Sequence, residues 1–73
     1  MHTYFITYYF YNNLKIRFLN FNREIKTPND VLNVEKFLKK MYGSGNLTVI
    51  SFSKLDEPYD DIVYDLDTGE KIE

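Results

Sequence analysis

The chain has 73 residues, of which 44% are hydrophobic and 18% aromatic, and its formal net charge at pH 7 is −2. A chain of this length forms one small domain, residues 1–73, and its apolar and aromatic content excludes intrinsic disorder. Because it has no cysteine, disulfides, zinc–thiolate sites and thiol catalysis are excluded. No long apolar run and no signal-peptide pattern occurs, so we expect a cytoplasmic protein that does not bind a membrane.

The first two expected elements are strands that form a hairpin. Residues 3–11 are almost all aromatic or β-branched, which favours a strand. The asparagine pair at 12–13 suits a two-residue turn, and residues 14–18 then alternate apolar and basic side chains, as a returning strand does. Such a turn places Tyr11 opposite Leu14. Both faces of the hairpin are therefore rich in apolar side chains.

A helix is expected between Thr27 and Gly43. Thr27 is a good N-cap residue, Pro28 suits the first helical position, and Gly43 suits a left-handed C-cap. A loop at 44–46 and a third strand at 47–55 follow. In that strand the alternation places Leu47, Val49 and Leu55 on one side and Ile50 and Phe52 on the other. The apolar stripe expected along the helix consists of Val31, Val34, Phe37, Leu38 and Met41.

The resulting fold class is α+β, in the order β-β-α-β. A three-stranded sheet in the order 2-1-3 is expected, with the helix on one face and a C-terminal acidic hairpin or tail. We expect the helix to cover the face that carries Tyr9, Ile16 and Phe18, which leaves the opposite face for the acidic hairpin, a partner or a second copy of the chain. A homodimer is therefore expected. The residues of this self-association face are Tyr4, Ile6, Tyr8, Phe10, Leu19 and Phe21.

The acidic C-terminal segment, residues 56–73, is the most distinctive feature. Residues 54–73 carry eight acidic side chains and two lysines, a net charge of −6, whereas residues 1–53 carry a net charge of +4. Two interpretations stay open: an interface for a basic protein surface, or a hairpin that packs on the core and aids solubility. In the first, the residues that contact the partner are Asp56, Glu57, Tyr59, Asp60, Asp61, Tyr64, Asp65 and Asp67.

Inside this segment the pattern indicates a hairpin rather than a reactive site. Residues 62–66 favour a short strand, Asp67-Thr68-Gly69 favours a turn, and residues 70–73 favour an edge strand. We interpret the Asp-Thr-Gly tripeptide as a hairpin turn and not as the catalytic turn of an aspartic protease. Because the carboxylate spacing does not match a calcium loop and His2 is the single histidine, we expect no catalytic residue, no metal site and no cofactor.

A second hypothesis places function on the sheet. Lys15 and Arg17 lie next to Tyr8 and Phe10 in the expected hairpin, and basic and aromatic side chains together are the ingredients of single-stranded nucleic-acid binding. The plainer interpretation is cation–π contact on a solvent-facing sheet. Because the chain is acidic overall, nucleic acid is the less favoured partner.

Several features of the chain as a whole carry a family resemblance. These are its size, its lack of alanine and glutamine, its acidic segment, the opening TYFITYYFYNN, and the stretch REIKTPNDVLNVEKFL that leads into a single helix. The chain resembles small α+β proteins encoded by phages and mobile elements of low-GC Gram-positive bacteria, including anti-CRISPR inhibitors of host defence. The resemblance implies a non-enzymatic protein that occupies a host nuclease or another host protein, often by mimicking nucleic-acid charge. It transfers no functional residue, because anti-CRISPR proteins share no common motif.

Overall fold

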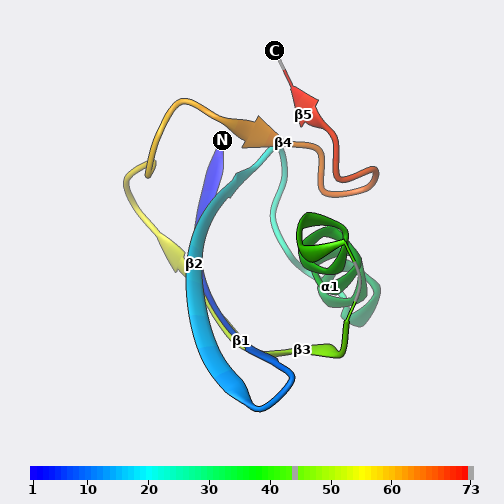
Figure 1. Cartoon of the computed structure of the whole chain (residues 1–73). Coiled ribbons are helices and arrows are strands. Elements are labelled where there is room, and N and C mark those ends of the chain that lie inside the picture. The colour runs from blue at the N-terminus through cyan, green and yellow to red at the C-terminus, as the bar shows by residue number, and fades with distance from the viewer. Residues whose placement is uncertain (44, 73) are drawn as a thin grey trace.

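The computed structural model describes residues 1–43 and 45–72, and these residues form one helix and a five-stranded sheet in the order β3-β1-β2-β4-β5. The helix lies on one side of a strongly curved sheet (Figure 1). No helix among the described residues is both long and apolar enough to cross a membrane. The elements are β1 (His2–Phe10), β2 (Asn13–Phe21), α1 (Pro28–Tyr42), β3 (Leu47–Leu55), β4 (Val63–Tyr64) and β5 (Lys71–Ile72).

The expected order of the three long strands is confirmed, with β1 in the centre and antiparallel to β2 and β3. The sheet has five strands rather than three, because the C-terminal hairpin joins it beside β2. β4 runs parallel to β2 with Tyr64 opposite Phe21, and the Asn22 N–H donates to the Tyr64 carbonyl oxygen at 3.0 Å. Two positions of the expected elements, residue 44 of the loop and residue 73 of the edge strand, lie outside the described residues.

The turn between β1 and β2 comes one residue earlier than expected. Phe10 pairs with Asn13, so the two turn residues are Tyr11 and Asn12, and Leu14 lies opposite Tyr9 instead of Tyr11. Tyr11 adopts a φ of 56°, which is costly for a residue other than glycine. Its N–H donates to the Asn46 carbonyl oxygen at 2.8 Å and its ring packs against Phe10 at 4.8 Å, so contacts outside the turn hold this conformation. The register shift is two residues, and each side chain therefore keeps the face expected for it.

The helix covers the opposite face from the one expected. Val34, Phe37 and Leu38 of α1 join the core cluster with the side chains of what we call the inner face of the sheet. The prediction that these strand side chains are bare and available for self-association is therefore wrong. Met41 of the expected helical stripe is instead 44% exposed. The inner face comprises Tyr4, Ile6, Tyr8, Leu19 and Phe21, each at most 5% exposed, and the partly buried Phe10.

Two buried hydroxyl groups help to explain this choice of face. The Tyr4 hydroxyl accepts a hydrogen bond from the Ile25 N–H at 2.9 Å, and the Tyr8 and Tyr42 hydroxyls lie 2.7 Å apart. The chain that connects β2 to α1, and the last turn of α1, therefore satisfy both phenols. Burial of a tyrosine costs little when its hydroxyl has such a partner.

A bulge in β3 changes which of its side chains face the helix. Thr7 pairs with Ser51 whereas Tyr8 pairs with Val49, which leaves Ile50 as the extra residue. Val49 and Phe52 consequently point to the same face, so the grouping expected from plain alternation is wrong. The Val49 N–H donates to Glu35 Oε2 at 3.0 Å, so α1 provides a partner for this edge amide.

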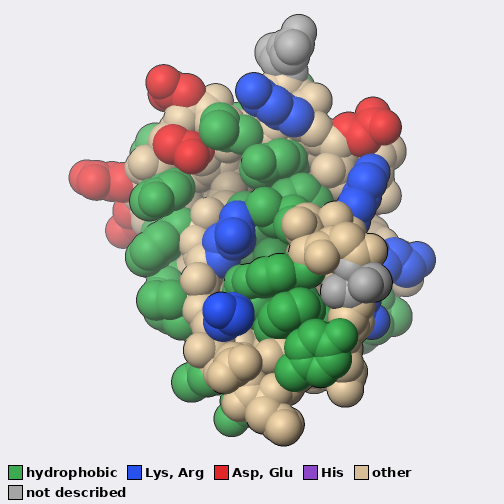
Figure 2. Space-filling model, viewed as in Figure 1, with side chains coloured by type: hydrophobic (Ala, Val, Ile, Leu, Met, Phe, Trp, Pro, Cys, Tyr) green, Lys and Arg blue, Asp and Glu red, His purple; other side chains and the backbone are tan. Residues whose placement is uncertain are grey.

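The outer face of the sheet points away from α1. In the β1–β2 and β1–β3 registers its residues alternate with those of the inner face, and none of them is charged. Figure 2 shows hydrophobic side chains along the flank of the molecule that this face forms, on the left in that view. The outer face consists of Thr3, Phe5, Thr7, Tyr9, Leu14, Ile16, Phe18, Asn20, Thr48, Ser51, Ser53 and Leu55.

Candidate interface: the acidic loop

The acidic loop, residues 56–61, connects β3 to β4, and all of its residues are exposed. Four of its six residues are acidic: Asp56, Glu57, Asp60 and Asp61. Among the described residues, none of these four carboxylates forms an ion pair. Acidic side chains gather over this loop at the upper left of Figure 2. The loop is thus a concentrated and uncompensated negative surface.

One buried amide, that of Asn20, holds the loop in place. Asn20 is 1% exposed, and its Nδ2 donates to Asp60 Oδ1 and to the Ile62 carbonyl oxygen, both at 2.9 Å. Its Oδ1 accepts from the Thr3 hydroxyl at 2.5 Å. Asp60 Oδ1 also accepts from the Ile62 N–H at 2.9 Å. Asp56, Glu57 and Asp61 therefore face solvent, whereas the Asp60 side chain and the backbone of Tyr59 and Asp60 are tied to Asn20 of β2.

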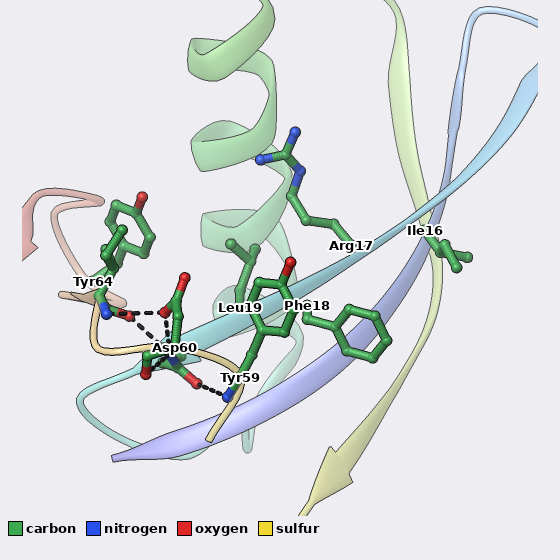
Figure 3. Close-up of a pocket in the computed structure, with 9 residues that line it drawn as sticks. Ile16, Arg17, Phe18, Leu19, Tyr59, Asp60 and Tyr64 are labelled. Carbon is green, nitrogen blue, oxygen red and sulfur yellow. Dashed lines mark hydrogen bonds between the residues drawn. The ribbon is translucent and has the colours of Figure 1, made fainter. Parts of the chain in front are cut away.

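Tyr59 closes the loop onto the outer face. Its ring stacks on Phe18 with the centroids 5.2 Å apart and 19° between the planes, yet the residue is 64% exposed. A groove of about 420 Å³ lies between β2 and the loop (Figure 3). Phe18, Tyr59 and Ile62 provide apolar walls and Asp60 provides a carboxylate whose Oδ2 has no partner among the described residues. Arg17 lines the same groove from the helix side of β2.

The other residues expected at the interface have structural contacts. The half-buried Tyr64 packs its ring on Phe37 at 4.7 Å. Asp65 shapes the turn: its Oδ1 accepts from the Asp67 N–H at 2.8 Å, and its carbonyl oxygen accepts from the Gly69 N–H at 2.7 Å. The Asp-Thr-Gly tripeptide therefore lies in the turn before β5, as expected.

Asp67 belongs to an ion-pair network that links the C-terminal hairpin to α1. Arg23 Nη2 lies 2.5 Å from Asp67 Oδ1 and 2.8 Å from Asp30 Oδ1. Asp30 Oδ2 also accepts hydrogen bonds from the N–H groups of Lys26 and Thr27. In turn, the Asp30 N–H donates to the Thr27 hydroxyl oxygen, which completes a capping box. The Arg23 guanidinium and these two N–H donors hold the pKa of Asp30 well below its usual range.

The same guanidinium lowers the pKa of Asp67, and the two carboxylates raise the pKa of Arg23. These three residues stabilise the entry of α1 and the C-terminal turn. The Asp67 carboxylate is therefore ion-paired within the chain, whereas the carboxylates of the acidic loop form no ion pair among the described residues.

Tyr8 and Phe10, the aromatic residues that the nucleic-acid hypothesis uses, also have partners inside the chain. Tyr8 is 1% exposed, and burial together with the hydrogen bond to Tyr42 raises the pKa of its hydroxyl. Phe10 stacks on Tyr42 with the centroids 4.1 Å apart and 15° between the planes. Lys15 is exposed, and Arg17 is half-buried with Nη1 3.8 Å from Met41 Sδ. The two rings that nucleic-acid bases were expected to stack on are thus covered from within the chain.

The described residues contain no group of three or more His, Asp or Glu side chains placed to hold a metal ion. His2 Nδ1 lies 3.9 Å from Glu24 Oε1, and the same carboxylate forms an ion pair with Lys54. Hydrogen bonding and attraction from Lys54 lower the pKa of Glu24. This cluster is a partly exposed charge network that ties the β2–α1 connection to β1 and β3.

Comparison of the chain with protein-family models, with curated proteins and with solved structures finds no match.

Proposed function

We propose that the chain is a small non-enzymatic binding protein that occupies a basic surface of another protein through its acidic loop. The observation that carries the proposal is the contrast within the acidic segment. Asp65 and Asp67 have partners inside the chain, whereas Asp56, Glu57 and Asp61 are exposed and have no ion-pair or hydrogen-bond partner among the described residues. Groups that contribute little to the fold are free to contribute to binding.

The anchoring of the loop favours binding of appreciable affinity. Because Asn20 and the stacked Tyr59 fix the loop backbone, the loop loses little conformational entropy when a partner binds. The groove beside the loop adds specificity. Its apolar walls match the aliphatic stem of a lysine or arginine side chain, and Asp60 Oδ2 matches the charged end.

The resemblance to phage and mobile-element proteins supplies the class of partner. A host nuclease exposes a basic groove for nucleic acid, and a rigid row of carboxylates can occupy such a groove in place of phosphates. We therefore propose an inhibitor of the anti-CRISPR type, acting in the cytoplasm of a bacterial host without a cofactor.

The test compares the chain with two variants that have the same net charge. The loop variant carries Asp56→Asn, Glu57→Gln and Asp61→Asn. The control variant carries Glu70→Lys and Asn46→Lys, which raise the net charge by the same three units at exposed positions outside the loop. Each protein is immobilised, exposed to bacterial lysate, and washed at low and at high salt, and captured proteins are purified for calorimetric titration.

We expect the chain and the control variant to retain the same basic protein, and the loop variant to lose it. Added salt should weaken the complex because the contacts are exposed ion pairs. Equal affinity of the loop variant and the control variant would leave the loop as a solubilising element only.

A further inference from the structure

The outer face differs from an ordinary exposed sheet face in its charge. All the charged residues of the three long strands, Lys15, Arg17 and Lys54, lie in register with inner-face residues. The outer face carries apolar, hydroxyl and amide side chains only. In an antiparallel sheet with one solvated face, residues normally alternate along each strand so that apolar side chains point to the core and polar ones point to solvent. The distribution is therefore reversed: the charges border the helix, and the solvent side has none.

The exposed apolar area on this face is large for a chain of this size. Leu14 is 61% exposed, Ile16 56%, Tyr9 43%, Phe18 36% and the adjoining Tyr59 64%. The three aromatic residues alone expose about 300 Å² at the usual side-chain areas. With the aliphatic residues the patch exceeds the few hundred Å² that monomers commonly expose, and it approaches the area that each partner buries in a small stable interface.

We propose that a second copy of the chain packs on the outer face, so that two sheets form a sandwich. An uncharged face can be buried against itself without desolvating a charge. By contrast, the usual charged surface of an unrelated protein would leave ions without partners there. Sheets pack face to face about 10 Å apart, a spacing at which apolar side chains of both copies interdigitate.

The distribution of charge also selects the orientation of the two copies. The acidic loop lies at one end of the sheet, and the β1–β2 turn lies at the other (Figure 1). A twofold pairing with the sheets antiparallel separates the two acidic loops, whose like charges would repel each other if both loops lay at the same end. A second copy on the outer face covers Phe18 and Tyr59, which also line the groove of the proposed function, so it competes with a basic partner for that groove. The mass and cross-linking measurements below need no such partner, so their failure is distinct from a failure of the proposed function.

The direct test is the mass in solution, measured by sedimentation equilibrium from low to high micromolar concentration. We expect the chain to approach twice its 8.8 kDa. Ile16→Asp on the outer face should weaken the dimer by about a hundredfold or more, because a carboxylate would be buried without a partner. The matched control is Leu32→Asp on α1, where the leucine is 53% exposed and points away from the sheet, and the dimer should persist.

Leu14→Asp provides a second outer-face variant, and circular dichroism verifies that each variant is folded. A chain that stays monomeric at high micromolar concentration overturns the proposal. The proposal is also overturned if the dimer dissociation constants of Ile16→Asp and Leu14→Asp equal that of Leu32→Asp.

The orientation is tested by disulfide trapping, since the chain has no cysteine of its own. Thr48 lies towards the turn end of β3 and Ser53 towards its loop end. An equimolar mixture of Thr48→Cys and Ser53→Cys should cross-link faster than either variant alone. Faster cross-linking within the separate variants would overturn the antiparallel arrangement.

Discussion

The two faces of the β1–β2–β3 sheet are built from similar amounts of apolar residue but differ in what covers them. The inner face packs on α1, and five of its side chains are at most 5% exposed: Tyr4, Ile6, Tyr8, Leu19 and Phe21. Among the described residues, the outer face is covered at one end only, where Asn20 and Phe18 contact the acidic loop. A single helix can bury one face of a small sheet, so the other face is left without a covering layer.

The comparison shows that hydrophobicity alone does not decide which face becomes the core. In this sheet the polar groups decide which face the helix covers. The tyrosine hydroxyls of the inner face find partners on the helix and its connection, whereas the hydroxyls of Ser51 and Ser53 on the outer face stay in solvent. Burial of the outer face under the helix would have left these groups without water.

The largest expected effect comes from truncating one phenylalanine on each face of β2. Phe21→Ala removes a ring that is 0% exposed and contacts Tyr4 and Phe37. We expect a loss of about 3–5 kcal/mol, comparable to the entire stability of a domain of this size. Phe18→Ala, where the ring is 36% exposed, should cost about 1 kcal/mol. Urea unfolding followed by circular dichroism at low micromolar concentration separates the two, and equal losses would contradict the assignment of faces.

The elements and their order could be predicted from the sequence, because each has strong local signals. The run of aromatic residues in β1 and the cap residues Thr27 and Gly43 determine their own secondary structure. The face covered by α1 could not be predicted, since it depends on contacts between distant residues such as Tyr8 with Tyr42. The bulge at Ile50 was missed for the same reason: nothing in the local alternation marks it.

The next largest effect tests how the outer face holds the acidic loop. Asn20→Ala removes the amide that binds Asp60 and Ile62 and leaves the Thr3 hydroxyl without its acceptor. We expect a loss of about 2–3 kcal/mol, and faster hydrogen exchange at Ile62. Asn29→Ala, at an exposed asparagine of α1, is the control and should change stability by less than about 0.5 kcal/mol. Unchanged protection of Ile62 in Asn20→Ala would show that the loop is held by other contacts.

The acidic segment could be predicted from its charge. Which of its residues have partners inside the chain, and which do not, could not be predicted. The sequence marks eight candidate residues in the acidic segment. Asp67 pairs with Arg23, forty-four positions away, and Tyr64 packs on a helical phenylalanine. Asn20 gave no signal in the sequence, because a single asparagine near the end of a strand is common. Its burial and its five side-chain hydrogen bonds arise only when Thr3 and the loop are brought together.

A smaller effect concerns the turn end of the inner face. Gly45 has a φ of 134°, and a Cβ at this position would lie 2.6 Å from Phe10 Cε1. Gly45→Ala should therefore strain the backbone and push Phe10 from its stack on Tyr42, at a cost of about 2 kcal/mol. Gly43→Ala is the comparison: its φ of 87° is also unfavourable, but a Cβ there meets nothing within 4 Å. Thermal unfolding should rank Gly45→Ala below Gly43→Ala, and the reverse order would contradict close packing at this end.

The smallest effect compares adjacent tyrosines on opposite faces of β1. Tyr8→Phe removes the hydroxyl that bonds Tyr42 and should cost about 1 kcal/mol at neutral pH, because the half-buried Tyr42 can turn to water. Tyr9→Phe, at a residue 43% exposed, should change stability by less than about 0.5 kcal/mol.

The pH dependence makes this comparison sharper. Burial, and then the bond to Tyr42, raise the pKa of Tyr8 above the value of about 10 that it has in the unfolded chain. Above that pH the unfolded chain loses the proton first, so stability falls as the pH rises through the higher folded value. Urea unfolding at pH 7 and above pH 10 should show a shallower alkaline decline for Tyr8→Phe than for Tyr9→Phe. Equal alkaline declines in the two variants would mean that burial does not raise the pKa of the Tyr8 hydroxyl.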